Sequence, residues 1–394
     1  MARLTAENIS NIPYGPLGII GMPGCEELTD KIDSYLVRWR KDQAQDHKDT
    51  LAFFGYERDS YKINVSVPRF GSGESKGVIQ QSVRGYDIYI ICDVFNYSCT
   101  YKMYGMEVPK SPDDHFADLK RIISALESKP KRISVIMPML YEGRQHKRSS
   151  RESLDCAMAL QELVNLGVEN IITFDAHDKR VQNAIPDKSF ENVMPTYQMI
   201  KALINTVDDL IVDKDHLMTI SPDEGAMFRN IYFASQLGIN LGMFYKQRDY
   251  TRVVNGRNPI IEHQYLGESV QGKDIIIVDD MISSGESMLE VASKLKSLGC
   301  GRIFVCTTFG LFCNGLDVFD KAYENGVFDR VFTTNGVYQS PELLNREWYV
   351  NVDLSKYTAY FIDTLNHDMS VSSLLDSSER IESLLIKEGL KEAE

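Results

Sequence analysis

The feature that most constrains the fold of this chain is a repeated alternation of short apolar runs with amphipathic segments. In the first half, apolar runs at 86–93, 133–138 and 170–173 alternate with helical patterns at 113–126 and 153–166. In the second half, runs at 217–221, 274–278 and 303–307 alternate with helical patterns at 225–237 and 286–298. Buried strands that alternate with helices predict parallel sheets covered by helices, so an α/β fold is expected.

The length of 394 residues predicts two domains, because one compact core rarely holds so long a chain. We place them at 1–195 and 196–394, without a Gly/Ser-rich or Pro-rich linker, and expect them to pack tightly. The polar segment 38–62 is interpreted as an excursion from the first domain rather than a core element. Residues 377–394 predict a charged amphipathic helix at the end of the second domain.

The composition excludes several classes of function. A net charge of −13 argues against general nucleic-acid binding. No apolar run approaches the roughly 20 residues that a membrane helix needs, and residues 1–16 do not resemble a secretory signal. The seven cysteines are scattered without a C-x-x-C pair, which favours a reducing cytoplasm over a disulfide framework or a zinc site.

The segment 274–288 carries the strongest chemical signal. An apolar strand ends in Asp279 and Asp280, the loop Ser283-Ser284-Gly285-Glu286-Ser287 follows, and a helix begins. Backbone N–H groups at the start of a helix bind phosphate, and paired carboxylates accept hydrogen bonds from the two adjacent hydroxyls of a ribose. The structural alternative is that the acids and serines only form a helix cap and a turn.

This unit resembles the loop that binds 5-phosphoribosyl 1-diphosphate (PRPP) in the type I phosphoribosyltransferase fold. From about residue 17 to 375 the chain resembles ribose-phosphate diphosphokinases. The resemblance rests on the order and spacing of several short motifs, which are Phe70-Gly71-Ser72-Gly73-Glu74 with Val83-Arg84-Gly85, Arg144-Gln145, Ser150-Arg151-Glu152, Thr173-Phe174-Asp175-Ala176-His177, Ser221-Pro222-Asp223-Glu224-Gly225 with Arg229, Lys246-Gln247-Arg248, Thr333-Thr334-Asn335 and Ser370-Val371-Ser372-Ser373-Leu374.

The resemblance implies two phosphoribosyltransferase-like domains in a pseudo-symmetric arrangement, with the active site between them. It implies transfer of the diphosphoryl group of ATP to the C1 hydroxyl of ribose 5-phosphate, with Mg²⁺ as cofactor. The implied roles are ATP binding by Phe70, Glu74, Arg144 and Gln145; ribose 5-phosphate binding by Asp279, Asp280, Ser283, Ser284, Gly285 and Ser287; metal binding by His177 and Asp223; and catalysis by His177, Lys246 and Arg248. It further implies a homo-oligomer in which Phe70 and Glu74 serve the ATP site of a neighbouring subunit.

Four positions depart from the family pattern. Glu286 places a negative charge in the phosphate loop, and Ser72 replaces the acid expected beside Glu74. Glu142 replaces an aromatic residue, and His146 replaces the acid that normally follows Arg144-Gln145. The chain is therefore expected to be a divergent member of the family.

The sequence is also compatible with two other functions. A phosphoribosyltransferase that consumes PRPP with a purine base could use the same phosphate loop. A non-catalytic regulatory homologue could keep the fold and associate with active subunits. Two copies of the fold argue against the first, and His177, Lys246 and Arg248 argue against the second.

Overall fold

The computed structural model describes residues 12–43, 55–248 and 260–391, without the side chains of Gln43, 246–248 and 260–263. These residues form two compact units. The first contains 1–194, 335–338 and 353–376, and the second contains 195–334, 339–352 and 377–394. From the sequence, all of 196–394 was expected in the second domain. In the structure, the chain instead returns to the first unit at 335–338 and 353–376.

The first unit is built on a five-stranded sheet in the order β1-β4-β7-β8-β9, and all four pairings are parallel. Its strands are β1 (Leu17–Gly21), β4 (Asp87–Ile91), β7 (Arg132–Ile136), β8 (Asn170–Phe174) and β9 (Ser189–Val193). Two small hairpins accompany the sheet, β2 (Val65–Ser66) with β3 (Val78–Ile79), and β5 (Thr100–Met103) with β6 (Met106–Pro109).

The helices of the first unit are α1 (Glu26–Gln43), α2 (Pro112–Ala125), α3 (Asp155–Asn165), the 3-10 helix η4 (Lys179–Ala184), α9 (Ser355–Asn366) and α10 (Ser372–Leu375). Helix α2 starts at a capping box, in which Ser111 and Asp114 each accept a hydrogen bond from the other's backbone N–H. The apolar faces of α2 and α3 join the strands in one core, which includes Phe116, Leu119 and Leu160.

The second unit is built on a seven-stranded sheet in the order β12-β11-β10-β13-β14-β15-β16. Only the pairing of β11 with β12 is antiparallel among these strands. The strands are β10 (Leu217–Ser221), β11 (Asn240–Arg248), β12 (Ile260–Leu266), β13 (Asp274–Ile282), β14 (Ile303–Gly310), β15 (Arg330–Thr334) and β16 (Tyr349–Val352).

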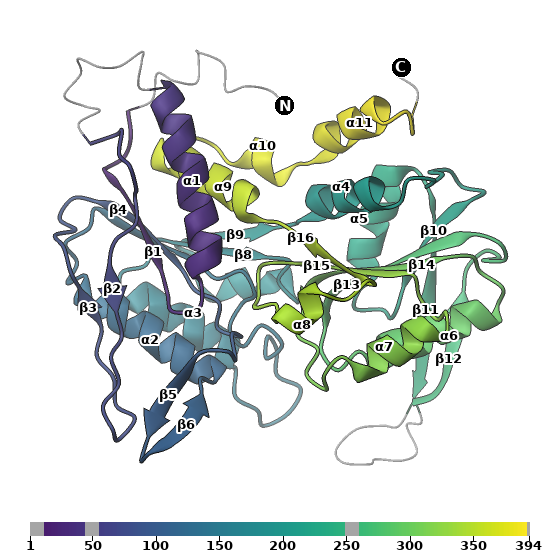
Figure 1. Cartoon of the computed structure of the whole chain (residues 1–394), viewed down its shortest axis with the longest axis horizontal. Helices are drawn as coiled ribbons and strands as arrows, with labels where there is room; N and C mark the ends of the chain where they lie inside the picture. Colours follow the sequence, from purple (N-terminus) through teal and green to yellow (C-terminus); the bar gives the residue numbers. More distant parts are fainter. Residues whose placement is uncertain (1–11, 44–54, 249–259, 392–394) are drawn as a thin grey trace. The chain divides into compact units, whose positions relative to one another are not determined.

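Helices cover both faces of this second sheet. One core contains residues of α6 (Glu286–Ser297), α7 (Asp317–Glu324) and α8 (Pro341–Leu344). The other contains residues of α4 (Thr196–Thr206), α5 (Met227–Leu237) and α11 (Ser378–Lys387). Figure 1 shows α4 and α5 above the sheet and α6 and α7 below it. The α/β class with parallel sheets flanked by helices is therefore confirmed.

The interpretation of 38–62 as an excursion outside the core is wrong for three of its residues. Arg40 belongs to α1, and it, Tyr56 and Tyr61 are buried. The Arg40 guanidinium lies over both tyrosine rings and donates to Asp363 and Asn366 of α9. Beside it, Trp39 of α1 stacks on Tyr360 with the ring centroids 4.4 Å apart. Arg40 can be buried because its charge has partners in a helix more than 320 residues away, whereas residues 44–54 of this segment lie outside the described structure.

No helix among the described residues is both long and apolar enough to span a bilayer.

Candidate active site

Three carboxylates gather where β10 and β13 end in the second unit. These two strands are parallel neighbours, with Ile220 opposite Ile277, so their carboxyl ends lie at the same edge of the sheet. Asp223 follows β10, and its Oδ1 accepts the N–H of Ala226 at 3.2 Å. Asp279 and Asp280 lie within β13, which runs four residues beyond the predicted end at Val278 because it continues to pair with β14.

The negative charges of this cluster are costly to hold together. Burial raises the pKa of Asp279 well above its ordinary range, and the neighbouring carboxylates of Asp280 and Asp223 raise it further. Asp280 is buried, and its Oδ2 lies 3.7 Å from the Arg229 guanidinium. A site of this kind favours ligands that bring hydrogen-bond donors or positive charge to the carboxylates.

A tight loop connects β13 to α6. Gly285 has φ +87°, and a Cβ added there would lie 2.3 Å from the ring of Phe319, so both backbone and space require glycine. Helix α6 begins at Glu286 without a side-chain cap among the described residues. Its leading N–H groups therefore need another acceptor, and a phosphate at the loop Ser283–Ser287 would supply one.

Glu286, the residue that departs from the family pattern, is exposed and contacts a second loop. Its Oε1 accepts a hydrogen bond from Asn314 Nδ2 at 3.3 Å. The Glu286 side chain thus has a neutral amide partner at the loop that connects β14 to α7.

In the first unit, Arg144 and Gln145 lie in the loop that follows β7. Gln145 donates from Nε2 to the Ser153 carbonyl at 2.9 Å, which closes the loop on itself. Arg144 is exposed. Glu142 adopts φ +54°, an uncommon conformation for a residue with a side chain, and accepts the N–H of Gln145 with its carbonyl. The loop is thus held in shape while Arg144 stays accessible for a ligand.

His177 follows β8 and lies beside the Arg144 loop. Its ring centroid is 5.3 Å from that of His146, and His146 Nε2 is 3.5 Å from Asp178 Oδ2. Hydrogen bonds from Arg180 hold the pKa of Asp178 well below its ordinary value, whereas burial lowers the pKa of His146. The structure therefore brings His177 and the Arg144 loop together through His146.

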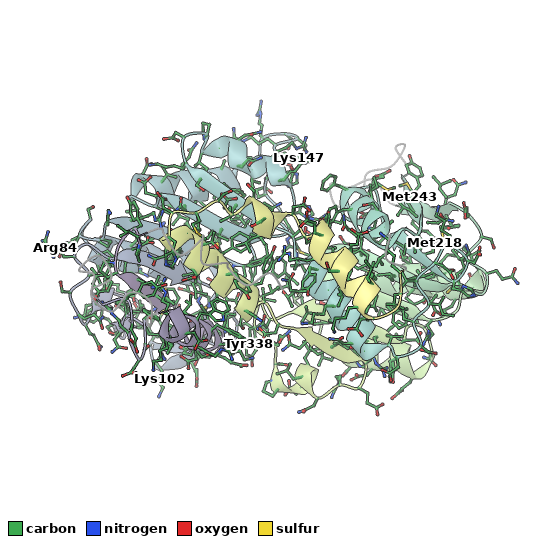
Figure 2. All side chains as sticks on the ribbon, turned by 90° about the horizontal axis from the view of Figure 1, so that it is seen from above. Arg84, Lys102, Lys147, Met218, Met243 and Tyr338 are labelled. Atoms are coloured by element: carbon green, nitrogen blue, oxygen red, sulfur yellow. The ribbon has the colours of Figure 1, made fainter. Side chains whose placement is uncertain are left out.

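Phe70 and Glu74 lie on a separate loop, closed by two backbone hydrogen bonds. Phe70 N–H donates to the Glu74 carbonyl at 2.8 Å, and Gly73 N–H donates to the Phe70 carbonyl at 2.9 Å. The Phe70 ring is 53% exposed, and Glu74 accepts a hydrogen bond from Ser72 Oγ. Arg84, in the second part of this motif, is exposed, and Figure 2 shows its side chain pointing outward from the first unit.

Two predicted catalytic residues lie at the limit of the described structure. Lys246 and Arg248 belong to the backbone of β11, whose pairing with β12 is irregular at Gln247 and Arg248. Their side chains lie outside the described residues.

Within the described residues, no group of three or more His, Cys, Asp or Glu side chains is arranged to bind a metal ion directly.

Comparison with known proteins identifies the family. Residues 17–167 match the N-terminal domain of ribose phosphate pyrophosphokinase, and residues 166–343 match the phosphoribosyl transferase domain. The ribose-phosphate pyrophosphokinase of Vibrio parahaemolyticus is 27% identical over 318 residues, which cover 79% of this chain and 91% of that protein. The chain belongs to the ribose-phosphate pyrophosphokinase family.

Other members of the ribose-phosphate pyrophosphokinase family give the same result. The protein of that name from Shewanella oneidensis is 28% identical over 316 residues, which cover 78% of this chain and 89% of that protein. The crystal structure of phosphoribosylpyrophosphate synthetase from Mycobacterium smegmatis superposes with a TM-score of 0.70 at 19% identity. It covers 89% of this chain and 99% of that one, and it supports the same fold.

Three residues support these motifs in ways that the sequence does not predict. Arg69 donates to the Gly73 carbonyl and to Asp118, and so supports the loop that carries Phe70. His146 links Asp178 to His177. Asn314 holds Glu286. His146 directly follows the motif Arg144-Gln145, whereas Asn314 lies outside every motif and gives no signal in the sequence.

Proposed function

We propose that this chain is an ATP-dependent ribose-phosphate diphosphokinase. It transfers the diphosphoryl group of ATP to the C1 hydroxyl of ribose 5-phosphate, giving PRPP and AMP. The observation that carries the proposal is the continuous unit of strand β13, its two acids, the glycine loop and helix α6, in a chain that matches this family over residues 17–343.

The second unit binds ribose 5-phosphate in this proposal. The N–H groups at the start of α6, with Ser283, Ser284 and Ser287, bind the 5-phosphate. Asp279 and Asp280 accept hydrogen bonds from the ribose hydroxyls. The raised pKa of Asp279 supports this role, because hydroxyl donors offset the cost of a half-buried carboxylate.

The first unit binds ATP. The exposed guanidinium of Arg144 pairs with phosphate oxygens, and Gln145 offers a donor and an acceptor to the nucleoside. The exposed ring of Phe70, with Glu74, contacts the adenine, and we propose that it does so for a second copy of this chain in a homo-oligomer. Lys246 and Arg248 neutralise charge on the transferred group as AMP leaves.

Magnesium is the proposed cofactor, and the donor chemistry fits it. Mg²⁺ keeps several waters and is usually bound by one or two carboxylates together with substrate phosphates rather than by a full protein cage. Asp223, one of the three clustered acids, offers such a carboxylate, and His177 can hold a metal-bound water through its exposed ring. When bound, the ion neutralises phosphate charge.

The test is AMP release from ATP with and without ribose 5-phosphate, in magnesium and in excess chelator. A diphosphokinase releases AMP only when ribose 5-phosphate and the metal are both present. A purine phosphoribosyltransferase releases none but forms a nucleotide from PRPP and a base. A non-catalytic homologue does neither, and either of these outcomes rejects the proposal.

His177→Ala tests the assignment of the metal partner. Loss of a residue that orients metal-bound groups lowers turnover about 10- to 100-fold, with an unchanged melting temperature because the ring is exposed. His216→Ala is the control, since His216 is an exposed histidine bonded to Asp213 and away from all predicted motifs. Equal activity of the two variants would remove His177 from the site.

A further inference from the structure

In the second unit, backbone hydrogen bonds join a second loop to the phosphate loop. Residues 311–316 connect β14 to α7. Leu311 N–H donates to the Ile282 carbonyl at 2.9 Å, and Cys313 N–H donates to the Ser283 carbonyl at 2.8 Å. The Cys313 sulfur lies 3.8 Å from Ser283 Oγ. The two loops therefore keep the parallel pairing of β13 and β14 beyond the ends of the strands.

A buried aromatic anchor fixes the direction of this second loop. Phe312 has φ +46°, and its ring is buried edge-on against Phe319, with the centroids 5.0 Å apart. Phe319 is the same residue whose ring leaves no room for a side chain at Gly285. With Phe312 turned inward, Cys313 and Asn314 both face solvent beside the phosphate loop. A strained backbone that is held by core packing in this way is common at ligand sites.

The exposed side of the 311–316 loop contacts Glu286, the acid that departs from the family pattern in the phosphate loop. Glu286 is the first residue of α6, where a carboxylate competes with a phosphate for the positive end of the helix. Asn314 donates its amide hydrogen to Glu286 Oε1. The carboxylate is thereby drawn toward the 311–316 loop.

We propose that residues 311–316 form a second wall of the 5-phosphate site and that Asn314 is a positioning residue for ribose 5-phosphate. Asn314 keeps the Glu286 carboxylate off the helix N-terminus, so that the phosphate can take its place there. The proposal deepens the function proposed above and rests on it.

Asn314→Asp tests the positioning role. Like charges at 314 and 286 push Glu286 back toward the phosphate, so the KM for ribose 5-phosphate rises about fivefold while kcat and the KM for ATP stay unchanged. The effect disappears in a Glu286→Gln background, and Asn314→Gln, which keeps the amide donor, restores the normal KM. Asn325→Asp is the control, because it adds the same charge at the far end of α7.

An unchanged KM for ribose 5-phosphate in Asn314→Asp overturns the positioning role. A rise that persists in the Glu286→Gln background overturns it too, because Asn314 would then act without Glu286.

Cys313 provides an independent test of the wall. It is exposed, whereas the six other cysteines are buried or half-buried, so N-ethylmaleimide should label it first. Saturating ribose 5-phosphate should slow labelling of the Cys313 peptide and leave the half-buried Cys99 and Cys300 unaffected. If ribose 5-phosphate triggers AMP release but does not slow the labelling of Cys313, residues 311–316 do not form a wall of the 5-phosphate site. The proposed function then still stands. Absence of that AMP release overturns both.

Discussion

Asp93, two residues beyond the end of β4, is a carboxylate whose charged form burial in the first unit disfavours. It is buried, and its oxygens accept the N–H groups of Phe95 at 2.9 Å and Tyr338 at 2.7 Å. Burial raises its pKa to about 7 even though both N–H groups favour the charged form. The folded chain therefore binds this proton more tightly than the unfolded chain does.

The consequence is a stability that falls as pH rises. The contribution of the protonated carboxyl is complete below about pH 4 and is lost as pH rises through about 7, a change of about 4 kcal/mol. We expect the free energy of unfolding of the parent protein, minus that of Asp93→Asn, to decrease by this order between pH 4 and pH 8. Urea titrations at several pH values measure it, and a constant difference would show that Asp93 does not titrate in this range.

Asp279 should lower the stability of the protein and raise its affinity for ribose 5-phosphate. Because its charged form is disfavoured by burial and by Asp280, Asp279→Asn should raise the melting temperature at neutral pH. It should also raise the KM for ribose 5-phosphate by about tenfold or more, since a charge-assisted hydrogen bond to the ribose is lost. Asp274→Asn, at the other end of β13, removes one of the two carboxylate partners of Arg302 and should lower stability without changing that KM. The opposite ranking of the two variants would contradict the assignment.

At the scale of elements, a buried ion cluster supports the loop that carries Phe70. The Asp118 carboxylate of α2 is buried and accepts hydrogen bonds from Arg69, Lys110 and Arg121. Arg69 also donates to the Gly73 carbonyl and lies over the Tyr101 ring of β5. One arginine therefore ties together the loop, the β5–β6 hairpin and α2.

Arg69→Lys keeps the charge but loses the planar fork that reaches Asp118 and Gly73 together. We expect the KM for ATP to rise by up to about tenfold, the factor that about 1.4 kcal/mol represents, with the KM for ribose 5-phosphate unchanged. Arg121→Lys serves as the control, because Arg121 contacts the same carboxylate without touching the loop. Steady-state kinetics compare the two, and similar KM values for ATP would refute a role for Arg69 in the nucleotide site.

The sequence predicted the helices and strands whose apolar residues recur at regular spacing within the element itself. The runs at 217–221 and 303–307 lie in β10 and β14, and the pattern at 286–298 matches α6 to within one residue. The β5–β6 hairpin was missed because its four-residue strands are largely exposed and show no apolar run. Among candidate site residues, the motif order pointed to Asp279 and His177, whose roles stay predictions, whereas the partners Asn314 and Arg69 depend on contacts between loops that no local pattern encodes.

At the scale of the molecule, the return of 353–376 to the first unit depends on buried polar pairs. Arg40 donates to Asp363 at 2.9 Å and to Asn366 at 2.7 Å, and both members of the ion pair are buried. Arg132 pairs with Asp87 and also donates to the Leu365 carbonyl at 2.6 Å. These contacts hold α9 against α1 and against the amino ends of the inner strands β4 and β7, and Figure 1 shows α9 beside α1.

Arg40→Met should lower the free energy of unfolding by about 3–5 kcal/mol, because Asp363 is then left buried without its cation. The double variant Arg40→Met with Asp363→Leu should recover much of that loss, since a well-packed apolar pair can replace a buried ion pair. Denaturant unfolding of the three proteins measures both effects. A double variant no more stable than Arg40→Met would show that the cost comes from packing against Tyr56 and Tyr61 rather than from the unpaired charge.

The return of the chain also sets an order for folding during synthesis. When residue 194 leaves the ribosome, α1 has been made, but Asp363, Asn366 and Tyr360 have not. Because synthesis proceeds at about 5–20 residues per second, these three residues follow on the order of ten seconds later. During this time Arg40 lacks Asp363 and Asn366 as partners. The second unit is encoded mainly within that interval, so most of it can form first. The first unit is therefore completed after most of the second unit, although most of its residues are synthesised first.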